Sequence, residues 1–188
     1  DIMRPGQDLY DITSNILLNI KPILEDFKPN LVIVHGDTTT AFAATLAAFY
    51  QKIKIGHVEA GLRTQDIYSP WPEEGNRKLI GVLTDYHFAP TNTSKNNLLN
   101  ENIDIEKITV TGNTVIDALQ LIVQKIENDS ELESKLINFI NESGFTGLDS
   151  KFILVTGHRR ENFGQGFLNI CEALKELAEK NSNINHEI

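Results

Sequence analysis

The feature that most constrains the fold is a regular alternation of short apolar runs with longer amphipathic segments. The apolar runs predict strands at residues 31–34, 53–58, 86–90, 107–112 and 151–157. Apolar residues at three- and four-residue spacing predict helices at residues 8–27, 38–51, 73–85, 93–102, 114–126, 131–143 and 165–180. Strands that are each followed by a helix require right-handed crossovers, so we predict an α/β fold with a mostly parallel sheet.

Composition and charge exclude several classes of partner. The chain has 17 basic and 26 acidic residues, a formal charge of −9, which argues against a nucleic-acid surface because phosphate binding needs a net basic face. No apolar run is long enough to predict a membrane span. Cys171 is the only cysteine, and its apolar helical surroundings predict a buried side chain. A single cysteine fits a reducing compartment, so we expect a cytoplasmic protein.

Two acidic side chains follow directly on predicted strands. The sequence reads "VHGDTTT" around Asp37 and "GHVEAG" around Glu59. Because ligands bind at the carboxyl ends of parallel strands, both are candidates for a shared crevice. The hydroxyls of residues 38–40 can cap the following helix, which leaves the Asp37 carboxylate free. The small residues after Glu59 allow close backbone approach, so we expect a partly desolvated carboxylate, a setting suited to acid/base chemistry.

The loop after Glu59, "LRTQDIYSPWP", delivers two more acids to a helix start. Its prolines stiffen the backbone and place Glu73 and Glu74 in the first turn of a helix, where acids also offset the helix dipole. Arg63 and Arg77 flank the loop and can pair with these acids, and the sequence leaves open which pairs form. Histidines at the strand ends, such as His87, are expected to hydrogen-bond the backbone in crowded turns.

One basic cluster stands out in this acidic chain. "GHRRENFG", residues 157–164, lies between a predicted strand and a predicted helix. Glycines, arginines and a helix N-terminus together predict a pocket for an anion such as a diphosphate. The alternative is a surface turn whose arginines pair with Glu161. Neither a GxGxxG nor a P-loop pattern is present, so dinucleotide and ATP sites lack their glycine loops.

Taken together, "VHGDTTTAFAATLAAFY", "GHVEAGLRTQDIYSPWPEEGNR" and "VTGHRRENFG" resemble the motifs of the bacterial non-hydrolysing UDP-N-acetylglucosamine 2-epimerases. The likeness runs from about residue 5 to about residue 180. It implies two Rossmann-like domains in a glycosyltransferase-B type architecture. It also implies interconversion of UDP-GlcNAc and UDP-ManNAc by inversion at C2, through UDP elimination to a 2-acetamidoglucal and re-addition, with no metal or nicotinamide cofactor.

The resemblance also implies roles for individual residues. Those it implies to be catalytic are Asp37, Glu59, Glu73 and His158. Those it implies to contact substrate, or in part a second regulatory nucleotide sugar, are Arg63, Glu74, Arg77, Arg159, Arg160 and Asn162. The partners implied are UDP-GlcNAc and UDP-ManNAc and a second copy of the chain in a homodimer. Neither a nucleic-acid nor a membrane partner is implied.

The likeness divides the chain unevenly. Residues 1–145 correspond to most of an N-terminal Rossmann-like domain plus crossover helices, and residues 146–188 to the first strand and helix of an incomplete second domain. Alternatives therefore stay open: an inactive truncated fragment, or a chain that binds a nucleotide sugar without turnover. A metal-dependent phosphoesterase, suggested by histidines and acids at the strand ends, is disfavoured because "GNT" at 112–114 lacks the histidine such enzymes use.

Overall fold

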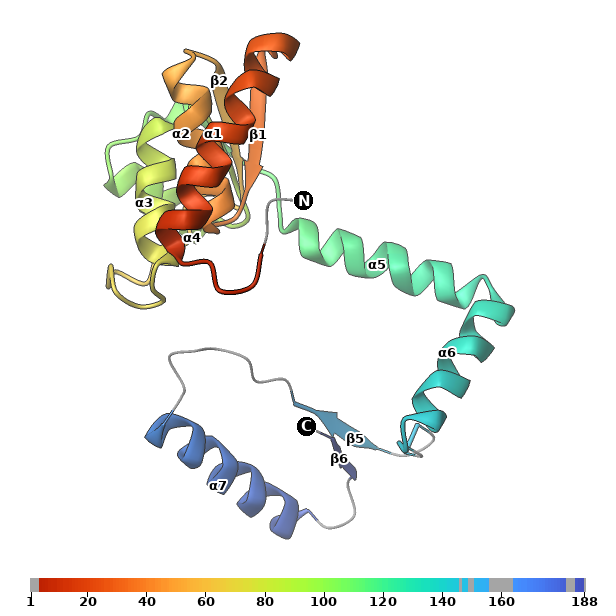
Figure 1. The fold of residues 1–188 in the computed structure, drawn as a ribbon. Coiled ribbons are helices and arrows are strands. Elements are labelled where there is room, and N and C mark those ends of the chain that lie inside the picture. The colour runs from red at the N-terminus through yellow and green to blue at the C-terminus, as the bar shows by residue number, and fades with distance from the viewer. Residues whose placement is uncertain (1–3, 146, 149–150, 156–163, 182–184, 188) are drawn as a thin grey trace. The chain divides into compact units, whose positions relative to one another are not determined.

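The computed structural model describes residues 4–145, 147–148, 151–155, 164–181 and 185–187 of the 188-residue chain. The chain forms two compact units, residues 1–118 and 119–188 (Figure 1). The division falls inside α5 (Thr114–Glu127), so the later part of this helix belongs with the second unit. The domain boundary expected after residue 145 stays a prediction.

The first unit is built on a sheet of parallel strands in the spatial order β1-β2-β3-β4. These strands are β1 (Leu31–His35), β2 (Lys54–Val58), β3 (Tyr86–Ala89) and β4 (Ile108–Val110). Strands that follow one another in the sequence are neighbours in space, and all run the same way. Every carboxyl end therefore lies at one edge of the sheet, as the sequence analysis predicted.

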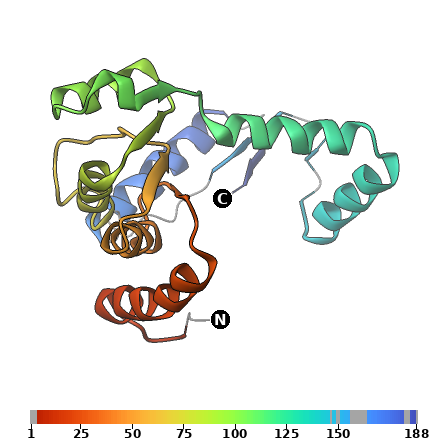
Figure 2. The same ribbon diagram turned by 90° about the horizontal axis from the view of Figure 1, so that it is seen from above.

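Helices connect these strands and pack beside one another. They are α1 (Leu9–Phe27), α2 (Thr39–Tyr50), α3 (Glu73–Leu83) and α4 (Asn92–Asn100), with a short 3-10 turn, η1 (Ile105–Lys107), before β4. α1 packs on α2 and α2 on α3, while α4 contacts β3 and β4 (Figure 2). Asp8 begins α1 with a capping box, and the hydroxyls of Thr38 and Thr91 cap α2 and α4. The predicted hydroxyl cap of the second helix is thus confirmed.

Two apolar clusters form the core of this unit. One joins Val34, Ala41, Ala48, Ile55 and Ile80, and so packs β1, β2, α2 and α3 together. The other cluster comprises Ala60, Ala89, Leu98 and Ile108. Because Ala60 belongs to the segment directly after β2, the start of the loop with the candidate acids is anchored in the core and not on the surface.

The second unit contains α6 (Ser130–Glu142), β5 (Phe152–Leu154), α7 (Gln165–Lys180) and β6 (Asn185–Glu187). β5 and β6 pair in parallel, with Phe152 opposite Asn185. Cys171 on α7 is exposed, so its predicted burial is wrong. The physical reason is that a pair of three-residue strands covers little of α7, whose Phe167 and Leu168 are also at least half exposed.

The predicted α/β class with a parallel sheet is confirmed in both units. Within the part of the chain that the structure describes, no helix has the length and apolar character needed to cross a bilayer.

Packing of α3 against the sheet gives a direct test of this core. Ile80 is fully buried, whereas Val82 on the same helix is 78% exposed. Ile80→Ala should lower the free energy of unfolding by about 2–5 kcal/mol, since it removes buried methyl groups and leaves a cavity. Val82→Ala is the matched control and should change it by less than about 0.5 kcal/mol. Urea unfolding followed by circular dichroism measures both, and equal losses would contradict this core assignment.

Candidate active site

Glu59 stands at the carboxyl end of β2 in an unusual backbone conformation. Its φ is 68°, in the left-handed region that residues with side chains rarely occupy. The side chain is 29% exposed, which agrees with the predicted partial desolvation. Its Oε2 lies 3.7 Å from His35 Nε2 and 3.4 Å from the point where a Cβ on Gly36 would stand. The Glu59 carboxylate therefore packs against the turn that ends β1.

Asp37 follows the same turn. The sequence analysis expected its carboxylate to be free, but the carboxylate is bound to an arginine. Its Oδ2 accepts hydrogen bonds from Arg77 Nε at 2.8 Å and pairs with Arg77 Nη2 at 2.6 Å. Its backbone carbonyl accepts a bond of 2.8 Å from Asn76 Nδ2. The expectation missed this because Arg77 lies 40 residues further along the chain, on α3. Two residues of α3 thus hold Asp37 in place.

Glu74 forms the other side of the Arg77 network. The side chain is fully buried, and its Oε2 accepts hydrogen bonds from Arg77 Nη1 at 3.1 Å and from the Thr64 backbone N–H at 3.2 Å. Oε1 has no hydrogen-bond partner among the described residues. Glu74 therefore links α3 to the loop that follows Glu59, a role beyond the dipole compensation that its position suggested.

Arg63 is equally buried and pairs with an acid that the sequence analysis did not single out. Its Nε and Nη2 donate to the two carboxylate oxygens of Glu101 at 2.8 and 2.6 Å, and Nη1 donates to the carbonyl of Leu62 at 2.8 Å. The Arg63 side chain is 1% exposed. These hydrogen bonds from Arg63 lower the pKa of Glu101. The substrate contact expected of Arg63 stays a prediction, and this burial does not favour it.

The arginine pairings divide the candidate acids into two kinds. Asp37 and Glu74 share Arg77, whereas Glu59 and Glu73 have no arginine partner in the described part of the chain. Glu73 is the first residue of α3 and is partly exposed. The candidate acids therefore differ in whether an arginine holds them in place.

A pair of buried histidines lies beneath this edge of the sheet. His57 and His87 are register neighbours in β2 and β3, and each is 1% exposed. His57 Nε2 donates to the carbonyl of Gly36 at 2.8 Å. The backbone bond predicted for His87 is not found, because neither of its buried ring nitrogens has a hydrogen-bond partner among the described residues. Burial lowers the pKa of His57. Burial, and after it the charge of His57, lowers the pKa of His87 to about 4.

The remaining predicted site residues lie outside the described residues. They are His158, Arg159, Arg160 and Asn162. The anion pocket predicted at 157–164 therefore stays a prediction. Among the residues that are described, no group of three or more histidine, cysteine or acidic side chains is arranged to hold a metal ion.

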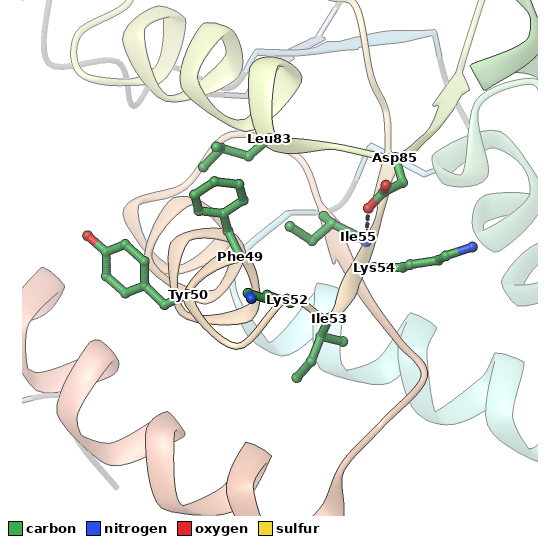
Figure 3. A pocket seen from close by; sticks show the side chains of 8 residues that line it. All are labelled: Phe49, Tyr50, Lys52, Ile53, Lys54, Ile55, Leu83 and Asp85. Carbon is green, nitrogen blue, oxygen red and sulfur yellow. Dashed lines mark hydrogen bonds between the residues drawn. The ribbon is translucent and has the colours of Figure 1, made fainter.

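A separate hollow of about 570 Å³ lies at the other edge of the sheet. Figure 3 shows Phe49 and Tyr50 from the end of α2 and Leu83 from the end of α3 around the start of β2. The Asp85 carboxylate beside it accepts a hydrogen bond of 2.9 Å from the Ile55 backbone N–H. The hollow borders the amino ends of the strands, so it is separate from Asp37 and Glu59, which follow the carboxyl ends of β1 and β2.

Comparison with known proteins agrees with this geometry. Residues 1–186 match the model of a family described as UDP-N-acetylglucosamine 2-epimerase. The chain belongs to the UDP-N-acetylglucosamine 2-epimerase family. Over 184 residues it is 59% identical to the UDP-N-acetylglucosamine 2-epimerase of Campylobacter jejuni and 58% identical to that of Salmonella typhimurium. Each alignment covers 98% of this chain but 48% of the relative, so the chain spans about half the length of these curated relatives.

Solved structures of the family have the same fold. The Neisseria meningitidis UDP-GlcNAc 2-epimerase, solved with UDP-GlcNAc, matches all of this chain and 50% of its own length with a TM-score of 0.87 and 52% identity. The Methanocaldococcus jannaschii enzyme, solved with UDP-GlcNAc and UDP, has a TM-score of 0.81 and 37% identity over 97% of this chain and 48% of its own. The predicted fold class, a Rossmann-like parallel sheet of the glycosyltransferase-B type, is confirmed.

The structure also reveals site residues that the motifs did not. Thr64, Asn76 and Glu101 hold the backbone or the arginines of the family motifs in place. Asn76 and Thr64 lie within the quoted motifs but carry no distinctive pattern. Glu101 carries no distinctive pattern either, because it lies at the C-cap of α4, 38 residues from Arg63.

The buried histidines predict a stability that falls in acid. His57 and His87 have a pKa below 6.5 in the folded chain. As the pH falls, each imidazole therefore gains a proton in the unfolded chain before it does so in the folded chain, and this favours unfolding. The free energy of unfolding should therefore be insensitive to these groups above pH 6.5 and fall as the pH drops below it, by at most ~1.4 kcal/mol per pH unit for each histidine. For His87 the loss should continue to about pH 4.

Urea unfolding at a series of pH values measures this slope. His87→Leu removes one titrating group and should flatten the slope over that interval. Val82→Ala is the matched control, because Val82 is 78% exposed and carries no titrating group, and it should leave the slope unchanged. Superimposable pH profiles for the His87 variant and the parent chain would contradict the assignment.

Proposed function

We propose that this chain supplies the acid/base carboxylates of an active site that interconverts UDP-GlcNAc and UDP-ManNAc by inversion at C2. The observation that carries the proposal is that Asp37 and Glu59 follow the ends of the adjacent strands β1 and β2, with the Glu59 carboxylate against Gly36, the residue before Asp37. Membership of the 2-epimerase family supports it, as does the UDP-GlcNAc bound to two of the related structures.

Inversion at C2 needs groups on both faces of the sugar, because a proton leaves one face and returns to the other. We assign Glu59 and Glu73, together with Asp37, to these transfers. The different settings of the three support a division of labour: Asp37 is held by Arg77, while Glu59 and Glu73 have no arginine partner among the described residues.

The proposed reaction is redox-neutral and balances within the substrate. A carboxylate takes the proton from C2, the C2–H electron pair forms the C1=C2 double bond, and the bond from C1 to the diphosphate oxygen breaks. UDP then adds back to C1 of the 2-acetamidoglucal as a proton is delivered to the opposite face of C2. No electron acceptor is consumed, so the proposal includes neither a nicotinamide nor a metal.

The departing diphosphate requires positive charge. We propose that His158, Arg159, Arg160 and Asn162 provide it, since the sequence places them between a strand and the N-terminus of a helix. Arg63, Glu74 and Arg77 are left out of this set. Their side chains are 1%, 0% and 14% exposed. Arg63 pairs with Glu101, and Arg77 pairs with both Glu74 and Asp37.

A homodimer and a cytoplasmic location complete the proposal. The aromatic rings of Phe49 and Tyr50 are 51% and 69% exposed beside the hollow in Figure 3, and exposed apolar surface of this kind supports an interface with a second copy. Sedimentation velocity tests the dimer. The single cysteine and the proposed nucleotide-sugar substrate support a cytoplasmic location for the protein.

A second candidate function is binding of a nucleotide sugar without turnover. It is favoured by one observation, the pairing of Asp37 with Arg77, which occupies one of the three candidate carboxylates. The two candidates differ in what happens at C2, since binding alone leaves the C2 proton in place.

Isotope exchange distinguishes the candidates. The chain is incubated with UDP-ManNAc in deuterated water, and the sugar is followed by proton NMR. Turnover should produce UDP-GlcNAc with deuterium at C2, because the removed proton is replaced from solvent. Calorimetric binding of UDP by folded chain, without any C2 exchange, would contradict turnover and favour the second candidate.

Replacing one carboxylate tests the assignment of Glu59. Glu59→Gln keeps the size of the side chain and removes its basicity, so C2 exchange should fall by about 10²–10⁴-fold while the fold is retained. Glu106→Gln is the matched control, because Glu106 is exposed at η1, and it should exchange at the parent rate. A near-parent rate for the Glu59 variant would show that Glu59 is structural.

A further inference from the structure

One face of α4 contacts the loop that begins at Glu59. Ser94, Asn97 and Glu101 are spaced by three and then four residues, so they lie along the same side of the helix and its C-terminal cap. All three meet residues 61–63 of the loop.

Each contact holds a different part of the loop. Gly61 has a φ of 87°, and a Cβ there would overlap the carbonyl oxygen of Ser94, so only glycine fits against this helix. Asn97 Nδ2 donates to the carbonyl of Gly61 at 2.9 Å. Glu101 accepts two hydrogen bonds from Arg63, at 2.8 and 2.6 Å, in the bidentate geometry that fixes a guanidinium most firmly.

The opposite side of the loop is held by α3. The Thr64 N–H donates to Glu74 Oε2 at 3.2 Å. The absence of a side chain at Gly81 makes room for the Arg63 guanidinium, since a Cβ there would stand 3.3 Å from Arg63 Nη2. Lys78 Nζ lies 3.7 Å from Glu101 Oε1 and adds to the same cluster. The segment just after Glu59 is thus fixed between two helices.

This fixation bears on Glu59 because its backbone is strained. A left-handed φ costs a residue with a side chain about 1–2 kcal/mol and persists only where the surroundings impose it. On the near side, the Ala60 N–H donates to the carbonyl of Phe88 at 3.0 Å. Without the contacts at Gly61 and Arg63, the backbone of residues 60–63 would be free to rotate, and Glu59 would relax to an extended conformation.

We propose that Asn97 and Glu101 are positioning residues that act through Gly61 and Arg63 to hold Glu59 in its left-handed conformation at the sheet edge. Arg63 thereby serves the site from within the protein, through the loop backbone. The catalytic meaning of this role rests on the proposed function, but the conformational role does not.

Two variants test the proposal, each with a matched control. Glu101→Gln is nearly isosteric and weakens the pair with Arg63, and Asn97→Ala removes the bond to Gly61. The controls are Glu106→Gln and Asn96→Ala, exposed neighbours on and beyond the same helix. Circular dichroism and urea unfolding first select variants that fold. Should Asn97→Ala fail to fold, the milder Glu101→Gln decides alone.

The primary readout is the conformation of Glu59 itself. Its Cα and Cβ chemical shifts should report a left-handed backbone in the parent chain and the controls, and move toward extended or averaged values in both test variants. Hydrogen exchange of the Ala60 and Thr64 amides should rise by at least about tenfold, with the α1 amides unchanged. Left-handed shifts and parent exchange rates in folded variants would overturn the proposal.

The kinetic readout separates this proposal from the proposed function. If the parent chain exchanges the C2 proton, kcat should fall about 10- to 100-fold in the test variants with KM little changed, because a displaced base affects the transition state more than binding. Parent kcat in variants with a relaxed Glu59 would overturn the positioning role. If the parent shows no exchange, the proposed function fails, and the chemical shifts alone decide the positioning role.

Discussion

The parallel pairing of β1 with β2 is the constraint on which the site depends. The register places His35 opposite Val58. The segments that follow the two strands therefore leave the sheet side by side, and Gly36 lies next to Glu59. A slip of one residue would turn each side chain to the other face of the sheet. His57 reinforces this register from below by donating to the Gly36 carbonyl. The buried histidine and the exposed carboxylate thus belong to one arrangement.

Two arginines then determine which acids remain available. Arg77 is shared by Asp37 and Glu74, and Arg63 is taken by Glu101. Buried ion pairs of this kind contribute little net stability, because desolvating the charges offsets most of their attraction, but they specify geometry closely. Their effect here is to fix the loop that follows Glu59 against α3 and the C-terminal end of α4. Among the described residues, Glu59 and Glu73 are the candidate acids that no arginine holds.

Much of this could be predicted from local sequence. The branched runs of the strands, the hydroxyl caps at Thr38 and Thr91, and the acids directly after the strands all depend on neighbours a few residues away. The exposure of Cys171 could not be predicted in this way, because an apolar helical face is buried only where enough sheet exists to cover it. The partner of Arg63 could not either, since Glu101 lies 38 residues away and is one of many acids in the chain.

The sequence by itself determined the α/β class, the order of strands and helices, the family, and the edge of the sheet at which the acids gather. These follow from periodicity and from motifs, which are local properties of the chain. Only the tertiary structure decided which arginine meets which acid, that Glu59 takes a left-handed backbone, and that one face of α4 holds the loop behind it. Those facts depend on side chains brought together from separate segments, and such proximity exists only once the core has packed.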